Sequence, residues 1–169
     1  GPTIVGNVEE YMNYYKIWTN YDVESEGVMI AYTSVYGNTK QAVEKLAQIL
    51  KDKGCKKVVV ADLAREDTYE NIENAFRYGK LVLATTTYNA GVFPKMREFI
   101  DHLLERNYQK RTIAFMENGS WAPAAAKNMA AMFEGAKDIT MAQNKVSIKI
   151  SVKDENVAQM EKLAEELLA

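Results

Sequence analysis

The sequence is poor in residues that bind metals or cross-link the chain. Its 169 residues include one cysteine, one histidine and three prolines. Cys55 cannot form an internal disulfide, and no cysteine or histidine cluster is available for zinc or an iron–sulfur centre. This composition predicts that the chain holds no metal, and it favours a reducing cytoplasmic location.

A large excess of charge and long apolar runs are also missing. The net charge of −2 at pH 7 leaves no basic footprint for nucleic acid, and no apolar run is long enough to cross a bilayer. We therefore expect neither a nucleic acid nor a membrane as a partner. The hydrophobic content of 47% and the length together suffice for one domain with a substantial core.

Apolar strands and helical patterns alternate along most of the chain. Continuous apolar strands of this kind are buried on both faces of a parallel sheet. Five strands with intervening helices fit the doubly wound order 2-1-3-4-5, in which the loops after strands one, three and four converge at the carboxyl edge. The expected strands cover residues 28–32, 58–61, 81–84, 113–116 and 146–150.

The first of these loops, Thr33–Thr39, is the most informative segment. It places hydroxyls and backbone amides between a strand and a helix start, where unpaired N–H groups and the helix dipole favour an anion. Asn38 stands where a nucleotide-triphosphatase loop needs lysine, and Gly37 is a single glycine where a dinucleotide fingerprint needs three. Taken alone, the loop fits an anion site and an ordinary capped turn equally well.

Two further loops are unusual in composition. Residues 85–94 include Tyr88 and Gly91, a glycine that permits backbone conformations penalised by a Cβ atom, and residues 117–123 include Trp121 in a small polar turn. Each aromatic has two readings, as the rim of the core or as the wall of a ligand site. Together the three loops supply a phosphate nest, a backbone-lined edge and aromatic faces, which suit a flat mononucleotide.

The three loops together resemble the flavodoxin superfamily, and more closely the flavodoxin-like domain of flavodiiron proteins (A-type flavoproteins). The resemblance rests on residues 34–39, 87–94 and 119–121 and covers roughly residues 27–169. It implies a flavodoxin-like three-layer α/β sandwich, with a five-stranded parallel sheet in the order 2-1-3-4-5, that binds FMN. The chain departs from the common pattern at Tyr36, where a small threonine is usual, and at Thr86, where many relatives carry proline.

The resemblance also implies which residues hold FMN. The first loop would hold the phosphate, the second would border the flavin edge and ribityl chain, and the third would cover the ring, with Trp121 as the stacking residue. The residues assigned in this way are Thr33, Ser34, Val35, Tyr36, Gly37, Asn38, Thr39, Thr86, Thr87, Tyr88, Asn89, Ala90, Gly91, Phe93, Glu117, Asn118, Gly119, Ser120 and Trp121.

Residues 1–26 look like the family's connector from a missing N-terminal diiron domain of the metallo-β-lactamase-like type. Gly1-Pro2 resembles the end of a His-Gly-Pro turn, and Gly1 as a tag remnant is the other reading. The connector is rich in aromatics, which should pack on something. Docking onto the domain's own surface is one reading, and an interface with the missing domain or a second subunit is the other.

The resemblance implies an electron-transfer domain of a flavodiiron oxidoreductase, which itself lacks the diiron active site and supplies no catalytic residue. It would receive electrons from a rubredoxin-like or other donor and pass them to a diiron site that reduces O2 or NO. The resemblance also suggests a homodimer. One alternative is a free-standing flavodoxin or NAD(P)H:quinone reductase. Another is a non-catalytic interaction module or phosphoacceptor receiver, although Thr33 and Thr86 occupy positions where a receiver needs acidic residues.

Overall fold

A parallel sheet organises the chain in the computed structural model, which describes residues 6–169. The sheet order is β2-β1-β3-β5-β6, with β7 also paired to β5 and β4 paired to β3. The strands are β1 (Ser25–Tyr32), β2 (Val58–Asp62), β3 (Tyr78–Tyr88), β4 (Gly91–Val92), β5 (Arg111–Gly119), β6 (Ile139–Met141) and β7 (Val146–Lys149). The helices are α1 (Val8–Thr19), α2 (Asn38–Asp52), α3 (Thr68–Arg77), α4 (Pro94–Glu105), α5 (Ala125–Met132) and α6 (Asp154–Leu168).

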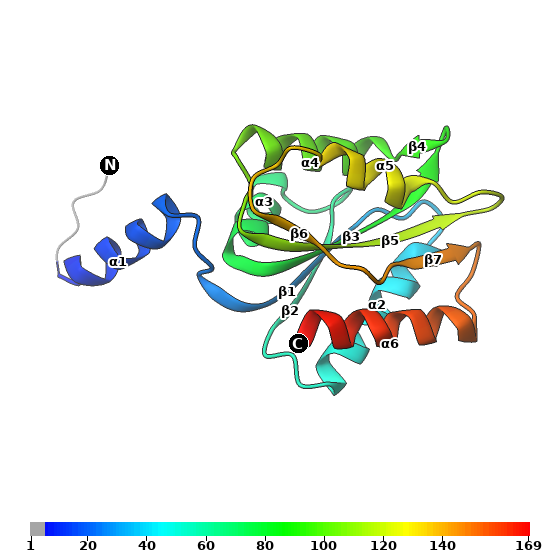
Figure 1. Ribbon diagram of the computed structural model, residues 1–169, viewed down its shortest axis with the longest axis horizontal. Coiled ribbons are helices and arrows are strands. Elements are labelled where there is room, and N and C mark those ends of the chain that lie inside the picture. The colour runs from blue at the N-terminus through cyan, green and yellow to red at the C-terminus, as the bar shows by residue number, and fades with distance from the viewer. Residues whose placement is uncertain (1–5) are drawn as a thin grey trace.

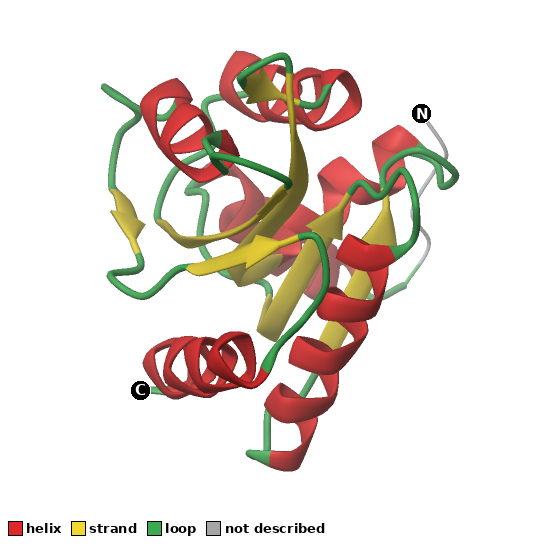
Figure 2. Cartoon of the chain, turned by 90° about the vertical axis from the view of Figure 1, so that its right-hand side faces the viewer, coloured by secondary structure: helices red, strands yellow, loops and turns green. Residues whose placement is uncertain are grey.

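Helices cover both faces of this sheet (Figures 1 and 2). One apolar cluster joins the sheet to α3, α4 and α5, and a second joins the opposite face to α2 and α6. Strands β1, β3 and β5 contribute alternating residues to the two clusters, so Met29 faces one helix layer and Ile30 the other. The flavodoxin-like three-layer sandwich is confirmed.

The predicted strand order is also confirmed, whereas the strand count is seven and not five. Strands β6 and β7 both lie parallel to β5, against its first and last residues respectively, and together occupy the place of the predicted fifth strand. Strand β4 adds a short antiparallel pairing after β3. Ile150, expected at the end of the last strand, lies beyond β7 at φ 70° with its side chain exposed.

Local sequence signals set two of the helix boundaries. Helix α2 ends at Asp52, two residues before Gly54, which adopts φ 89° as a glycine just beyond a helix end commonly does. Pro94 opens α4, where its fixed φ and missing N–H cost nothing. Both are local signals that the sequence carries without any tertiary contact.

The interruption between β6 and β7 is held by α6. The Glu166 carboxylate accepts hydrogen bonds from Gln143 N at 2.6 Å, Asn144 N at 2.9 Å and Asn144 Nδ2 at 2.7 Å. Burial alone would raise the pKa of Glu166, but these N–H donors lower it below its usual value. A carboxylate on the neighbouring helix therefore fixes the segment that leaves the sheet.

The connector forms a helix that the sequence analysis did not anticipate. Helix α1 stands apart from the sheet (Figure 1), and none of its residues is buried. Val8, Tyr11, Met12, Tyr15 and Trp18 are each more than half exposed. Their spacing in the sequence places them on one side of a helix, and this pattern could have predicted α1. Docking of this aromatic cluster onto the domain's own surface is therefore wrong for α1.

The end of the connector, in contrast, is firmly attached to the domain. The buried Arg111 guanidinium donates to Tyr21 O at 2.7 Å and to Asp22 O at 3.1 Å, and it also bonds Phe76 O at the end of α3. Burial lowers the pKa of Arg111. Carbonyl oxygens from the connector and from α3 thus share one cation, which joins the two segments.

We expect Glu166→Ala to lower the free energy of unfolding by about 1–3 kcal/mol, because it removes the acceptor for three N–H groups. The contribution of Glu166 is complete above the unfolded-state pKa of 4.5 and is lost as the pH falls through the lower folded-state value. Urea unfolding of wild type and variant from pH 7 to pH 3 measures both effects. Glu155→Ala, on an exposed residue of the same helix, is the matched control. A constant difference across this pH range would contradict the assigned role.

Candidate functional site

The loops after β1, β3 and β5 meet at the carboxyl edge of the sheet, as the strand order predicts. They surround a hollow of about 250 Å³. Ten of the expected site residues line it: Ser34, Val35, Tyr36, Asn38, Thr39, Thr86, Thr87, Asn118, Gly119 and Ser120. The eleventh lining residue is Ile150, which the sequence analysis placed in a strand and did not assign to the site.

The first loop offers several backbone donors to this hollow. Gly37 adopts φ 89° just before α2, a conformation suited to glycine, and an added Cβ there would meet no atom within 4 Å. The Ser34 hydroxyl accepts from Gly37 N at 3.1 Å and from Lys40 N at 3.3 Å. The described residues provide no acceptor for the N–H groups of Val35, Tyr36, Asn38 and Thr39. Such a cluster of free donors at a helix start fits a phosphate.

Threonine pairs connect the first loop to the second. Thr33 Oγ1 and Thr85 Oγ1 lie 2.6 Å apart in a buried hydrogen bond, and Thr39 Oγ1 and Thr86 Oγ1 lie 3.3 Å apart. The register of β1 on β3, which pairs Tyr32 with Ala84, places these loops side by side. The Thr33 side chain is 1% exposed, so its hydroxyl holds the two loops together and does not face the hollow.

The second loop makes a tight turn between β3 and β4. Tyr88 pairs with Gly91, and the two residues between them, Asn89 and Ala90, adopt φ 47° and 57°. Two successive left-handed residues are typical of the hairpin turn that matches strand twist. Gly91 does not adopt a positive φ, so the strained positions lie at Asn89 and Ala90 and not at the glycine. Phe93 packs edge-on against Tyr88, with ring centroids 5.7 Å apart.

The buried side chain of Glu117 anchors the third loop to neighbouring elements. This side chain is 1% exposed, and its carboxylate accepts from Ala126 N at 2.8 Å and Ser147 Oγ at 2.9 Å, with Lys145 Nζ at 3.4 Å. Its carboxylate therefore supports the start of α5 and is not directed at a ligand in the hollow. Sequence reasoning had no signal for this role, because the partners lie on different elements.

Other side chains complete the frame around the third loop. Asn118 exchanges two hydrogen bonds with Ile150, each 3.1 Å long, which connects this loop to the chain after β7. Thr87 Oγ1 accepts from Ala124 N at 3.0 Å and Ala125 N at 3.3 Å, so a strand residue caps α5. The Asn118 and Thr87 side chains thus line the hollow and set its shape at the same time.

The aromatic residues at the rim differ in their surroundings. The Trp121 side chain is 91% exposed, as is Tyr36, whereas Tyr88 is 50% exposed. A tryptophan this open contributes no packing to the core, so its reading as core rim is wrong. Tyr36 lines the hollow, and Trp121 follows the lining residue Ser120 in the chain; packing in the core explains neither exposed side chain.

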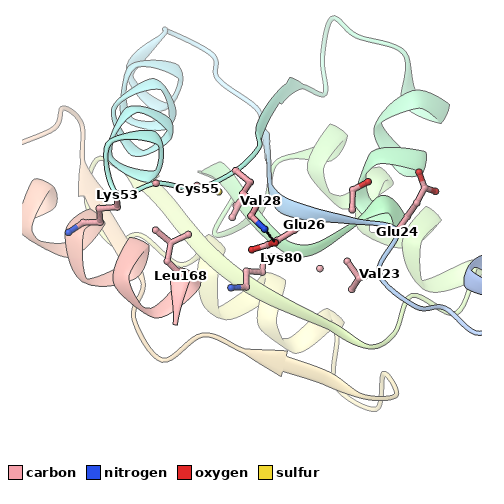
Figure 3. A pocket seen from close by; sticks show the side chains of 13 residues that line it. Val23, Glu24, Glu26, Val28, Lys53, Cys55, Lys80 and Leu168 are labelled. Carbon is pink, nitrogen blue, oxygen red and sulfur yellow. Dashed lines mark hydrogen bonds and ion pairs between the residues drawn. The ribbon is translucent and has the colours of Figure 1, made fainter.

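Three larger hollows lie away from these loops. The smallest of them, about 380 Å³, lies beyond the ends of α4 and α5, and the other two are larger still. One, of about 530 Å³, is at the amino ends of β1 and β3 (Figure 3). Its lysines are engaged: Lys56 pairs with Glu26, Lys53 pairs with Glu161 and Glu165, and Lys80 donates to Leu167 O. The other, of about 610 Å³, lies between the connector and α3, where Arg77 and Arg111 are hydrogen-bonded. The charged side chains named here are therefore already engaged with other groups of the protein.

Within residues 6–169, no group of three or more His, Cys, Asp or Glu side chains is arranged to hold a metal ion. The same residues contain no helix with the length and apolar character that a bilayer crossing requires.

Comparison with known proteins agrees with this fold and loop geometry. The flavodoxin domain family matches residues 29–160, which is most of the chain. The chain belongs to the flavodoxin domain family. Membership implies a flavin cofactor, and the residues that line the hollow belong to this matched region.

Solved structures with this fold include flavodiiron proteins. This flavodoxin domain superposes on rubredoxin:oxygen oxidoreductase from Desulfovibrio gigas with a TM-score of 0.83 and 17% identity, covering 94% of our chain and 40% of that one. For the Giardia intestinalis flavodiiron protein the TM-score is 0.85 at 15% identity, with coverage of 97% and 41%. The Streptococcus pneumoniae flavodoxin gives a TM-score of 0.67 at 21% identity, with coverage of 83% and 97%.

Among curated proteins, the anaerobic nitric oxide reductase flavorubredoxin of Salmonella paratyphi A is 24% identical over 132 residues. The match covers 77% of this chain and 27% of that protein. The chain therefore spans about a quarter of its curated relative and about two fifths of the flavodiiron structures.

We expect Thr85→Val to lower the free energy of unfolding by about 1–3 kcal/mol, because it leaves the buried Thr33 hydroxyl without a partner. The double variant Thr33→Val/Thr85→Val should recover most of this loss, since neither hydroxyl remains. Urea denaturation of the single and double variants measures the coupling. Thr140→Val, on an exposed β6 residue, serves as control. A double variant less stable than both single variants would show that the hydroxyl pair is not what holds these loops together.

Proposed function

We propose that the hollow binds FMN through its phosphate. The observation that carries this proposal is the set of four backbone N–H groups, at Val35, Tyr36, Asn38 and Thr39, that lack protein acceptors beside the hollow. Hydroxyls of Thr39 and Thr86 add donors on the same side. No lysine or arginine lines the hollow, so the phosphate would be held by N–H dipoles and by the positive end of α2.

The remainder of the cofactor would lie between the second and third loops. Thr87–Gly91 would border the flavin edge and Asn118–Trp121 would cover the ring, with Trp121 stacking on it. Trp121 supports this assignment because its exposed face has no partner in the domain. When bound, FMN supplies one- and two-electron redox chemistry, while the protein binds, orients and shields it.

We further propose that the chain is the electron-transfer domain of a flavodiiron oxidoreductase. Relatives that share its fold are named as reductases of oxygen or nitric oxide, and they extend well beyond the part that this chain matches. Electrons from a rubredoxin-like or other donor in the cytoplasm would pass through FMN to a diiron site that reduces O2 or NO. A homodimer is a compatible arrangement that stays a prediction.

The fraction of this chain that each solved structure matches favours this assignment over a free-standing flavodoxin. The S. pneumoniae flavodoxin matches over 97% of its own length but only 83% of this chain, whereas the G. intestinalis flavodiiron protein covers 97% of this chain. The difference of 14% corresponds to about 24 of the 169 residues, close to the length of residues 1–26, proposed as the connector. This comparison supports residues 27–169 as the flavodoxin-like domain and a diiron domain as its partner.

We expect the purified chain to bind FMN with a yellow flavin spectrum, and Trp121→Ala to raise the Kd about 5-fold to 100-fold, because stacking on a ring is lost. FMN titration monitored by flavin fluorescence measures this change. Trp18→Ala on α1 is the matched control, since it removes the other exposed tryptophan far from the hollow. Absence of FMN binding to the wild-type chain would refute the cofactor assignment. An unchanged Kd in Trp121→Ala would refute only stacking.

We also expect the FMN-loaded chain to show no steady-state reduction of quinones by NAD(P)H, because an electron-transfer domain needs no nicotinamide or quinone site. A spectrophotometric assay with both nicotinamides and a soluble quinone tests this. Sustained turnover, abolished when FMN is removed, would favour the quinone reductase alternative.

A further inference from the structure

The turn between β3 and β4 holds a backbone conformation that one of its two central residues, Ala90, disfavours. Asn89 and Ala90 both have positive φ, and Ala90 is a residue for which the left-handed conformation is unfavourable. Asparagine tolerates this conformation because its side chain can bond locally, whereas alanine has no such compensation. The pairing of β3 with β4 favours such a turn, and a contact from another element can stabilise it further.

One side-chain contact reaches this turn from another element. Asn128 on α5 donates from Nδ2 to the Ala90 carbonyl oxygen at 2.8 Å, across 38 residues of sequence. A carbonyl oxygen only accepts, so the amide nitrogen must face it. The contact fixes the direction of the Ala90 carbonyl, and hence the orientation of the peptide between Ala90 and Gly91.

Helix α5 is itself attached to both loops beside the hollow. Its first N–H groups bond to Thr87 on the β3 side and to Glu117 on the β5 side. The Asn128 contact adds a further link from the same helix, beyond the end of β3. The start of α5 therefore determines how far the Tyr88 turn and the Trp121 loop lie from one another.

We propose that Asn128 is a positioning residue, which holds the turn Tyr88–Gly91 in its left-handed conformation against α5 before any cofactor binds. The effect of Asn128 on FMN affinity rests on the proposed function, in which this turn borders the flavin. Without the Asn128 amide, the turn samples other conformations and the edge of the site must be ordered when FMN enters. Affinity falls by the cost of that ordering.

The test compares four variants of the full chain: Asn128→Ala, Asn128→Asp, Lys127→Ala and Asn128→Ala/Ala90→Gly. Asn128→Asp keeps the side-chain shape but removes the donor, and Lys127→Ala changes an exposed neighbour on the same helix. Glycine at residue 90 makes the left-handed conformation accessible without the amide. Amide hydrogen exchange of residues 87–92 in the FMN-free protein measures the turn, and FMN titration measures its consequence.

We expect Asn128→Ala and Asn128→Asp to accelerate exchange in residues 87–92 and to raise the Kd for FMN, each by about 3-fold to 10-fold, the size of one hydrogen bond. Lys127→Ala should change neither quantity, and Ala90→Gly should restore much of the affinity lost in Asn128→Ala. Unchanged exchange in both Asn128 variants would overturn the proposal. Faster exchange with unchanged FMN affinity would overturn the positioning role.

Failure of Ala90→Gly to restore affinity would show that the left-handed turn is not what Asn128 maintains, and would also overturn the proposal. If the wild-type chain binds no FMN, the proposed function fails, and so does the role of Asn128 toward the cofactor. The exchange measurement still reports separately on whether the amide holds the turn.

Discussion

The pairing of β1 with β3 is the constraint on which the site depends. Strand β2 lies on one side of β1, and the chain then returns to form β3 on its other side. The loops after β1 and β3 therefore end at the same edge of the sheet, although they are distant in sequence. The buried hydroxyl pair of Thr33 and Thr85 shows how closely they approach. A single-residue slip of this register would reverse the faces of β1 and separate the two loops.

The site divides into groups that face the hollow and groups that shape it. Backbone donors of the first loop remain free, whereas several polar side chains around them are already bonded within the protein. Glu117 and Thr87 satisfy the N–H groups at the start of α5, and Asn118 connects the third loop to Ile150. Groups that are bonded before a ligand arrives need no reorganisation, so they are suited to building a preformed site.

The two ends of the domain have different chemistry. The carboxyl edge has free donors and exposed aromatics, while at the amino edge charged groups are paired and Arg111 binds the end of the connector. Helix α1 projects from that second end with an apolar side open to solvent. A 12-residue helix without tertiary packing is marginally stable in water, so this helix would gain stability from a covering surface.

The sequence by itself determined the sheet order, the helix boundaries near the site and the three converging loops, because apolar periodicity and turn residues are local signals. It did not determine the divided fifth strand, helix α1, or the inclusion of Ile150. It also could not separate ligand-facing from structural roles at Thr33 and Glu117. Tertiary structure decided these points, because they depend on hydrogen bonds between side chains and elements that are distant along the chain.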